Sequence, residues 1–107
     1  MYNNHNYLNI LRQLANFKRI TQRELATNLG YSLGKLNYCL KELKKKGLIK
    51  VSNFKKNTNN QKYIYVLTPK GISYRTKLTI NFMKLKMKEY DDLKKDLEES
   101  KKNNLNI

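Results

Sequence analysis

Apolar side chains recur at helical spacing near the start of the chain. They fall on one broad face between residues 7 and 17, at Tyr7, Leu8, Ile10, Leu11, Leu14, Ala15 and Phe17. This periodicity predicts a first helix over residues 7–17. The polar residues 1–6 before it are expected to be frayed, and Ile20 after it suits a short bridging strand.

Two shorter helices are predicted next, joined by a glycine turn. Thr21 is a good N-cap, and Glu24 three residues later completes a capping box. Gly30 ends this helix because glycine accepts the left-handed conformation cheaply. Ser32 caps the next helix, which Gly47 closes. At about 100° per residue its leucines share one sector that should face the core, namely Leu33, Leu36, Leu40 and Leu43.

Two β-branched and aromatic segments follow, at residues 48–54 and 63–67, with a polar, basic stretch between them. They predict a hairpin with a long basic tip. Thr68 and Pro69 then suit the N-cap and first position of a last helix, which is expected over about residues 70–100. We predict a mainly α fold with a small β-hairpin wing, a winged helix-turn-helix with a long C-terminal helix. Its core should contain Leu11, Leu14, Leu25, Leu29, Leu36, Leu40, Leu43 and Ile49.

The last helix carries more apolar surface than a head of 70 residues can cover. We therefore divide the chain into a DNA-binding domain, residues 1–70, and a dimerisation helix with a frayed tail, residues 71–107. A second copy in a two-fold dimer would bury the surplus surface. The expected dimer contacts are Ile72, Leu78, Phe82, Leu85, Tyr90, Leu93 and Leu97. The alternative is a helix that folds back on its own head.

Charge indicates a polyanionic partner. The 107 residues carry 23 basic and 8 acidic side chains, a net charge of +15. Residues 1–70 hold 14 basic and 2 acidic side chains, and residues 71–107 hold 9 and 6. The positive field is thus concentrated on the helix-turn-helix part, where release of counterions would favour nucleic acid. An AT-rich coding bias would explain lysine in place of arginine, but it would not explain the scarcity of glutamate.

Catalytic and metal chemistry find little support in the sequence. Cys39 is the only cysteine and His5 the only histidine, and neither has a plausible catalytic partner. We interpret Cys39 as a semi-buried packing residue and His5 as a solvated residue of the leader. A Gly-rich phosphate loop and a metal-ligand cluster are both missing, so we expect neither an enzyme nor a cofactor. No signal peptide or membrane span is evident, which favours a cytoplasmic protein.

The exposed N-terminal half of the predicted second helix of the motif is the end that normally meets base edges. The candidate DNA-binding residues there and one turn beyond are Ser32, Gly34, Lys35, Asn37, Tyr38, Lys41 and Lys45. In the hairpin tip, Lys55, Lys56 and Lys62 are expected to contact phosphates or the minor groove. For the helix residues the alternative is that they are merely solvated and have no role.

The segment TQRELATNLGYSLGKLNYCLKELKKKGLIKVSNFKK, together with LTPKGI, resembles the EPS-associated branch of the MarR-type winged-helix regulators. The resemblance covers roughly residues 5–98. It implies a DNA-binding transcriptional regulator, usually dimeric, with its recognition helix at residues 32–46 and its wing at residues 54–63. The chain is shorter than a typical MarR protein, which has helices on both sides of the winged domain. A small-molecule effector is therefore not expected, although it stays an open alternative.

We weigh three hypotheses for function. The leading one is a homodimeric regulator that binds specific sequences of double-stranded DNA. The second is a winged-helix module that binds nucleic acid by charge alone, and the two differ in specificity ratio rather than in affinity. The third is a protein-interaction module that docks a polymerase or a replication factor, whose binding to polyanions would vanish at physiological salt.

Overall fold

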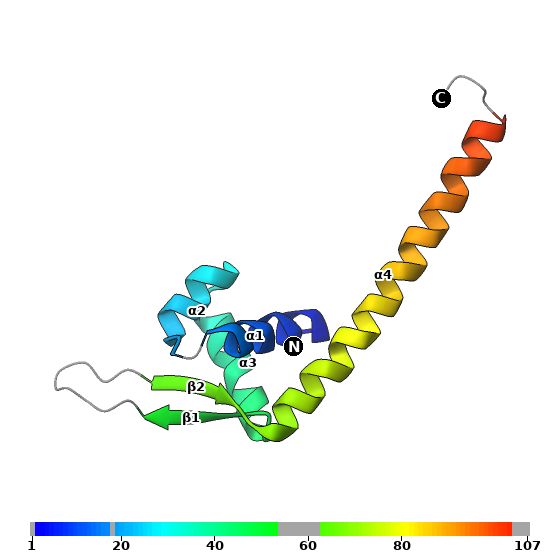
Figure 1. Cartoon of the computed structure of the whole chain (residues 1–107). Helices are drawn as coiled ribbons and strands as arrows, with labels where there is room; N and C mark the ends of the chain where they lie inside the picture. Colours follow the sequence, from blue (N-terminus) through cyan, green and yellow to red (C-terminus); the bar gives the residue numbers. More distant parts are fainter. Residues whose placement is uncertain (1, 18, 54–62, 104–107) are drawn as a thin grey trace.

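The computed structural model describes residues 2–17, 19–53 and 63–103, and within them it has the expected winged-helix architecture (Figure 1). Three helices, a two-stranded antiparallel sheet and a long last helix follow one another along the chain. They are α1 (Asn4–Asn16), α2 (Gln22–Leu29), α3 (Leu33–Lys45), β1 (Ile49–Asn53), β2 (Tyr63–Leu67) and α4 (Pro69–Asn103). The predicted fold class is thereby confirmed.

Helix α1 begins three residues earlier than predicted, so the expectation of a frayed leader is wrong for residues 4–6. Asn3 is the N-cap, and its side chain and that of Asn6 each bond the other's backbone N–H in a capping box. The ring of His5 contacts the ring of Phe82 edge-on, with centroids 5.2 Å apart. His5 therefore contacts α4 from within α1, while its side chain remains exposed as expected.

The caps of α2 and α3 are those that the sequence predicts. Thr21 and Glu24 form the capping box of α2, and the hydroxyl of Ser32 accepts a hydrogen bond from the Lys35 backbone N–H. Gly30 ends α2 with φ of +71°, a conformation that costs other residues steric strain. Because both boundaries are set locally, the turn between the two helices has a defined length and α3 has a defined starting point.

The sheet lies against α1 and α2 (Figure 1). β1 and β2 pair in an antiparallel register with Ile49 opposite Leu67 and Val51 opposite Tyr65. An isolated bridge between Thr21 and Ile64 adds the short third segment expected beside Ile20. The hairpin is therefore tied to the start of α2.

One core holds the head together. Seven of the eight predicted core residues are buried, and the eighth, Leu29, is partly buried against the same cluster. Leu33 differs from them, because it is 50% exposed even though its helical angle places it near the buried leucines. The prediction that Leu33 faces the core is wrong, because the first turn of α3 extends beyond the packed head.

The start of α4 is anchored on the segment after α3. The hydroxyl of Thr68 donates to the Gly47 carbonyl at 2.6 Å, and the Thr68 backbone N–H donates to the Leu48 carbonyl at 3.1 Å. At Gly71 the helix passes so close to the Leu48 carbonyl that a Cβ there would lie 1.9 Å from the carbonyl oxygen. Two helical turns further on, Leu78 is buried in the core. The first part of α4 thus packs as part of the head.

Beyond the head α4 continues as a straight rod into solvent (Figure 1). The molecule measures 69 × 25 × 25 Å, and its radius of gyration is 19.2 Å. A compact chain of this size would have a radius of gyration of about 13 Å. The alternative of a last helix folded back on its own head is therefore wrong. None of the helices in the described ranges is both long and apolar enough to traverse a lipid bilayer.

Replacement of Gly71 by alanine should lower the free energy of unfolding by about 1–3 kcal/mol, because the new methyl group displaces backbone and not a flexible side chain. Urea unfolding followed by circular dichroism measures the loss. Gly34→Ala is the matched control: nothing lies within 4 Å of its Cβ position, and alanine should gain up to about 1 kcal/mol from helix propensity. Equal stability of the two variants would contradict the close packing of α4 on Leu48.

Candidate nucleic-acid interface

The exposed side of α3 carries a row of side chains four residues apart. Leu36, Leu40 and Leu43 face the core, whereas Leu33, Asn37, Lys41 and Lys45 are all exposed. Residues spaced by four lie above one another on a helix, so these four form one ridge along its axis. The ridge begins with an apolar and an amide side chain and ends with two ammonium groups. None of the described residues forms a hydrogen bond or an ion pair with either ammonium group.

Asn37 is held by a side chain of the preceding helix. The Gln22 Nε2 group at the start of α2 donates a hydrogen bond to Asn37 Oδ1. A carbonyl oxygen has two lone pairs and an amide nitrogen has two protons, so Asn37 keeps one acceptor and both donors for a ligand. The bond between the two helices therefore orients the amide without using up its capacity.

Lys35 and Tyr38 lie on the edge of α3 that borders α1. The Lys35 ammonium lies 3.9 Å from the ring centroid of Tyr31, and the Tyr38 ring meets the ring of Tyr2 edge-on at 5.3 Å. The Tyr31 hydroxyl in turn accepts hydrogen bonds from the side-chain amides of α1 at Asn6 and Asn9. Both predicted DNA-binding residues thus have partners within the chain.

Ser32 and Gly34 complete the first turn of α3. The Ser32 hydroxyl oxygen is engaged as the N-cap, so its role in the free chain is structural. Gly34 leaves open space on the exposed side, with nothing within 4 Å of its Cβ position. The helix can therefore approach a flat or grooved surface closely at this point.

Acidic groups are scarce around this ridge. In the described part of the head they are Glu24 and Glu42, and the Glu24 carboxylate accepts two hydrogen bonds from Thr21 in the capping box. Lys44 and Lys50 add positive charge on exposed positions of α3 and β1. Lys55, Lys56 and Lys62, the predicted wing contacts, lie outside the described residues.

Sequence reasoning missed two residues of this surface. Leu33 was assigned to the core by its angle alone, and Gln22 was not considered because its contact with Asn37 joins two elements. A signal was present for Leu33: it directly follows the N-cap and is therefore the first residue of the helix. For Gln22 periodicity offers no signal, because it describes one helix at a time.

The predicted dimer contacts on α4 fall into two groups. Leu78 is buried and Phe82 is partly buried against the core of the same chain. The other five, which are Ile72, Leu85, Tyr90, Leu93 and Leu97, are between 49% and 67% exposed. Met83 and Met87 on the same helix are exposed as well. The exposed group is available to another molecule, whereas Leu78 is used within the head.

Neither Cys39 nor Tyr7 lies in an environment that would make its side chain reactive. Cys39 is fully buried on α3, which goes further than the semi-buried position expected for it. Burial raises the pKa of its thiol, so the unreactive protonated form dominates at neutral pH. Burial likewise raises the pKa of Tyr7. Within the described residues no three acidic, cysteine or histidine side chains gather as a metal site would require.

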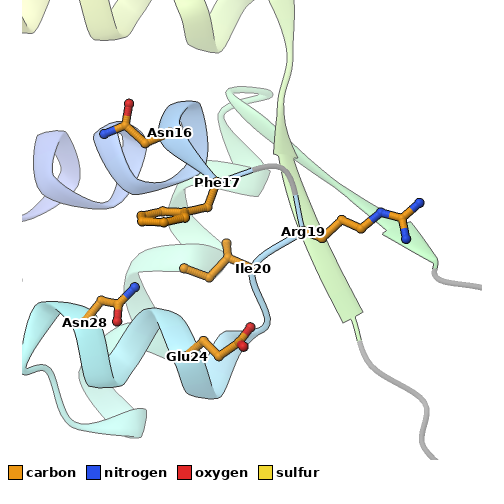
Figure 2. A pocket seen from close by; sticks show the side chains of 6 residues that line it. All are labelled: Asn16, Phe17, Arg19, Ile20, Glu24 and Asn28. Atoms are coloured by element: carbon orange, nitrogen blue, oxygen red, sulfur yellow. The ribbon is translucent and has the colours of Figure 1, made fainter.

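Two hollows lie away from the ridge. Figure 2 shows the first between α1 and α2, where Phe17 and Ile20 lie side by side while Arg19 points away from them. Its only carboxylate, Glu24, belongs to the capping box, so the hollow offers no acid–base pair. The second is an open groove of about 540 Å³ between α1 and α4. It is lined by Leu8, Arg12, Arg75, Phe82, Met83 and Met87 among others.

Comparison with known proteins agrees with this fold. Residues 4–50 match the family model described as winged helix-turn-helix DNA-binding. No curated protein matches the chain. The fold resembles that of a PadR-like transcriptional regulator from Bacillus cereus, at 18% identity and a TM-score of 0.73 over 81% of this chain and 89% of that one.

Two Staphylococcus aureus proteins are similar as well. MepR, solved in a complex with DNA, is 21% identical with a TM-score of 0.67 over 94% of this chain and 73% of that one. MarR, solved with salicylate and kanamycin, is 20% identical with a TM-score of 0.62 over 97% and 75%. The chain thus has the winged helix-turn-helix fold, which it shares with DNA-binding transcription regulators.

Proposed function

We propose that the chain is a MarR-type transcriptional regulator that binds specific sequences of double-stranded DNA as a homodimer. The observation that carries the proposal is the exposed ridge of α3, with Leu33 and Asn37 at its N-terminal end and Lys41 and Lys45 beyond them. A recognition helix needs base-reading groups at its start and cations that reach phosphates further along. The ridge supplies both in that order.

The exposed part of α4 supports the homodimer. Met83, Tyr90 and Leu97 recur every seven residues, and Leu93 lies between two of them. Such a repeat is the packing surface of a coiled coil. All four side chains are about half to two-thirds exposed, which is unfavourable for an isolated chain in water. A second copy would cover this stripe and part of the groove between α1 and α4. It would also present two recognition helices to an inverted repeat.

The resemblance to the EPS-associated branch suggests control of genes for polysaccharide synthesis. We leave the effector open in this proposal. The groove between α1 and α4 is where a ligand would have the most room, yet the dimer stripe adjoins it through Met83. MarR, which has a similar fold, was solved with salicylate and kanamycin, and this observation concerns that protein alone.

Lys41→Ala should weaken binding to the selected DNA site by about 1–3 kcal/mol and binding to random DNA by much less. Lys41 is exposed in the middle of the ridge and has no described partner within the chain, so its loss should leave folding intact. The site is first recovered by selection from a random DNA pool, and both affinities are then measured by fluorescence anisotropy at fixed salt. Lys102→Ala is the matched control, since it removes an equal charge at the far end of α4.

Equal losses on both DNAs would assign Lys41 to the phosphate backbone. If the selection recovers no preferred sequence, the chain is a module that binds nucleic acid by charge. If binding to DNA disappears at physiological salt, a protein-docking role replaces the DNA-binding one. Each of these results contradicts a different part of the proposal, and the recovery of an inverted repeat supports all of it.

A further inference from the structure

The start of the ridge on α3 combines three side chains that the geometry brings onto one edge. Leu33 is exposed in the first helical turn, and Asn37 lies directly above it one turn later. Gln22 reaches Asn37 from α2 and holds its amide by a hydrogen bond. An apolar group thus lies beside an oriented amide at the end of the helix that meets base edges.

Leu33 lies outside the buried core of the chain. It is 50% exposed and is not part of the buried core, whereas Leu36 on the next turn is fully buried. A single exposed leucine needs no explanation by itself. Here, however, it stands in a row whose other members are an amide and two lysines, on the face that the proposed function turns toward DNA. It is the apolar member of that row.

The chemistry of these groups matches one base pair. An asparagine amide pairs with adenine when its oxygen accepts from N6 and its nitrogen donates to N7. Asn37 Oδ1 keeps one lone pair after the bond from Gln22, and both protons on Nδ2 are free of described partners. In the major groove the thymine of an A·T pair presents a methyl group, which attracts apolar side chains. Guanine and cytosine offer no such group.

We propose that Leu33 and Asn37 read adenine and thymine together. Asn37 forms the bidentate contact with an adenine, and Leu33 packs against the methyl group of a thymine in the same or the neighbouring base pair. Gln22 is a positioning residue, because it acts through the orientation of the Asn37 amide and does not touch the base. This inference rests on the proposed function, and it goes beyond it by naming the bases that this edge of the helix selects.

The test uses the full-length protein and the DNA site recovered by selection. Each thymine of a half-site is replaced in turn by deoxyuridine, which lacks only the methyl group. At one position the wild-type protein should bind about fourfold more weakly, the effect of exposing one methyl group. Leu33→Ala should bind the thymine and deoxyuridine sites equally. Each adenine is likewise replaced by 7-deazaadenine, which lacks the N7 acceptor, and one position should lose about 5- to 150-fold.

Gln22→Ala distinguishes positioning from folding. It should shrink the penalty for 7-deazaadenine at the Asn37 position while leaving the deoxyuridine penalty and the melting temperature unchanged. Lys44→Ala, on the same helix but outside the ridge, should keep both penalties at their wild-type size.

Three outcomes would overturn the inference. If no thymine of a well-defined site is sensitive to loss of its methyl group, Leu33 does not read bases and the proposed function still stands. If the deoxyuridine penalty persists in Leu33→Ala, another side chain reads the methyl group. If the selection yields no preferred sequence, the proposed function fails and this inference fails with it.

Discussion

A chain that ends at residue 84 should bind an inverted-repeat DNA site about 10²- to 10⁴-fold more weakly than the full chain. Two linked recognition helices bind the second half-site from a high effective concentration, and a monomer loses that advantage without losing any contact of its own. The cut removes five exposed apolar side chains of the distal α4, namely Leu85, Met87, Tyr90, Leu93 and Leu97. It keeps Leu78 and Phe82, which pack on the head.

The position of the cut matters, because a chain that ends at Gly71 would also lose Leu78 from the core. Weaker binding would then have two possible causes. The shortened chain should be monomeric by sedimentation velocity at micromolar concentration, and it should bind a single half-site as tightly as before. In the full-length chain, replacement of both Leu93 and Leu97 by lysine should have the same effect as the cut, whereas Lys95→Ala on the opposite side of α4 should have none. A monomeric wild-type chain would contradict the homodimer directly.

Most element boundaries of this fold can be predicted from sequence because local hydrogen bonds set them. Thr21 with Glu24, Ser32, and Thr68 before Pro69 each supply an acceptor for otherwise unpaired N–H groups at a helix start. Such a cap involves residues three positions apart, so it is visible in a short window of sequence. The exception is α1, where Asn3 and Asn6 form an equivalent box from a pair of asparagines. In an Asn-rich leader that pair does not differ from its neighbours.

The contacts of the candidate site are harder to foresee than its helix. Periodicity correctly places Asn37 and Lys41 on the exposed side of α3, but it does not show that Gln22 holds Asn37 or that Tyr31 lies beneath Lys35. Those contacts depend on the angle between helices, which the packing of the core determines. The exposure of Leu33 has the same origin, since a helical angle says which way a side chain points and not how far the core extends.

Leu36→Ala should lower the free energy of unfolding by about 2–5 kcal/mol, the largest stability change that we predict. Leu36 is fully buried on the inner side of α3, and its truncation removes apolar contacts and leaves a cavity that the surrounding helices fill only partly. The small head has a single core, so a loss of this size is a large share of its total stability. Urea unfolding monitored by circular dichroism measures it.

The matched control is Leu33→Ala, the same substitution one turn earlier on the same helix. Leu33 is half exposed, so this variant should lose well under half as much stability as Leu36→Ala. The DNA affinities should show the opposite order when both proteins are measured well below their unfolding midpoints: Leu33→Ala should weaken specific binding, whereas folded Leu36→Ala should retain most of it. A large stability loss in Leu33→Ala, or a small one in Leu36→Ala, would mean that α3 is rotated about its axis. The ridge that we assign to DNA would then point elsewhere.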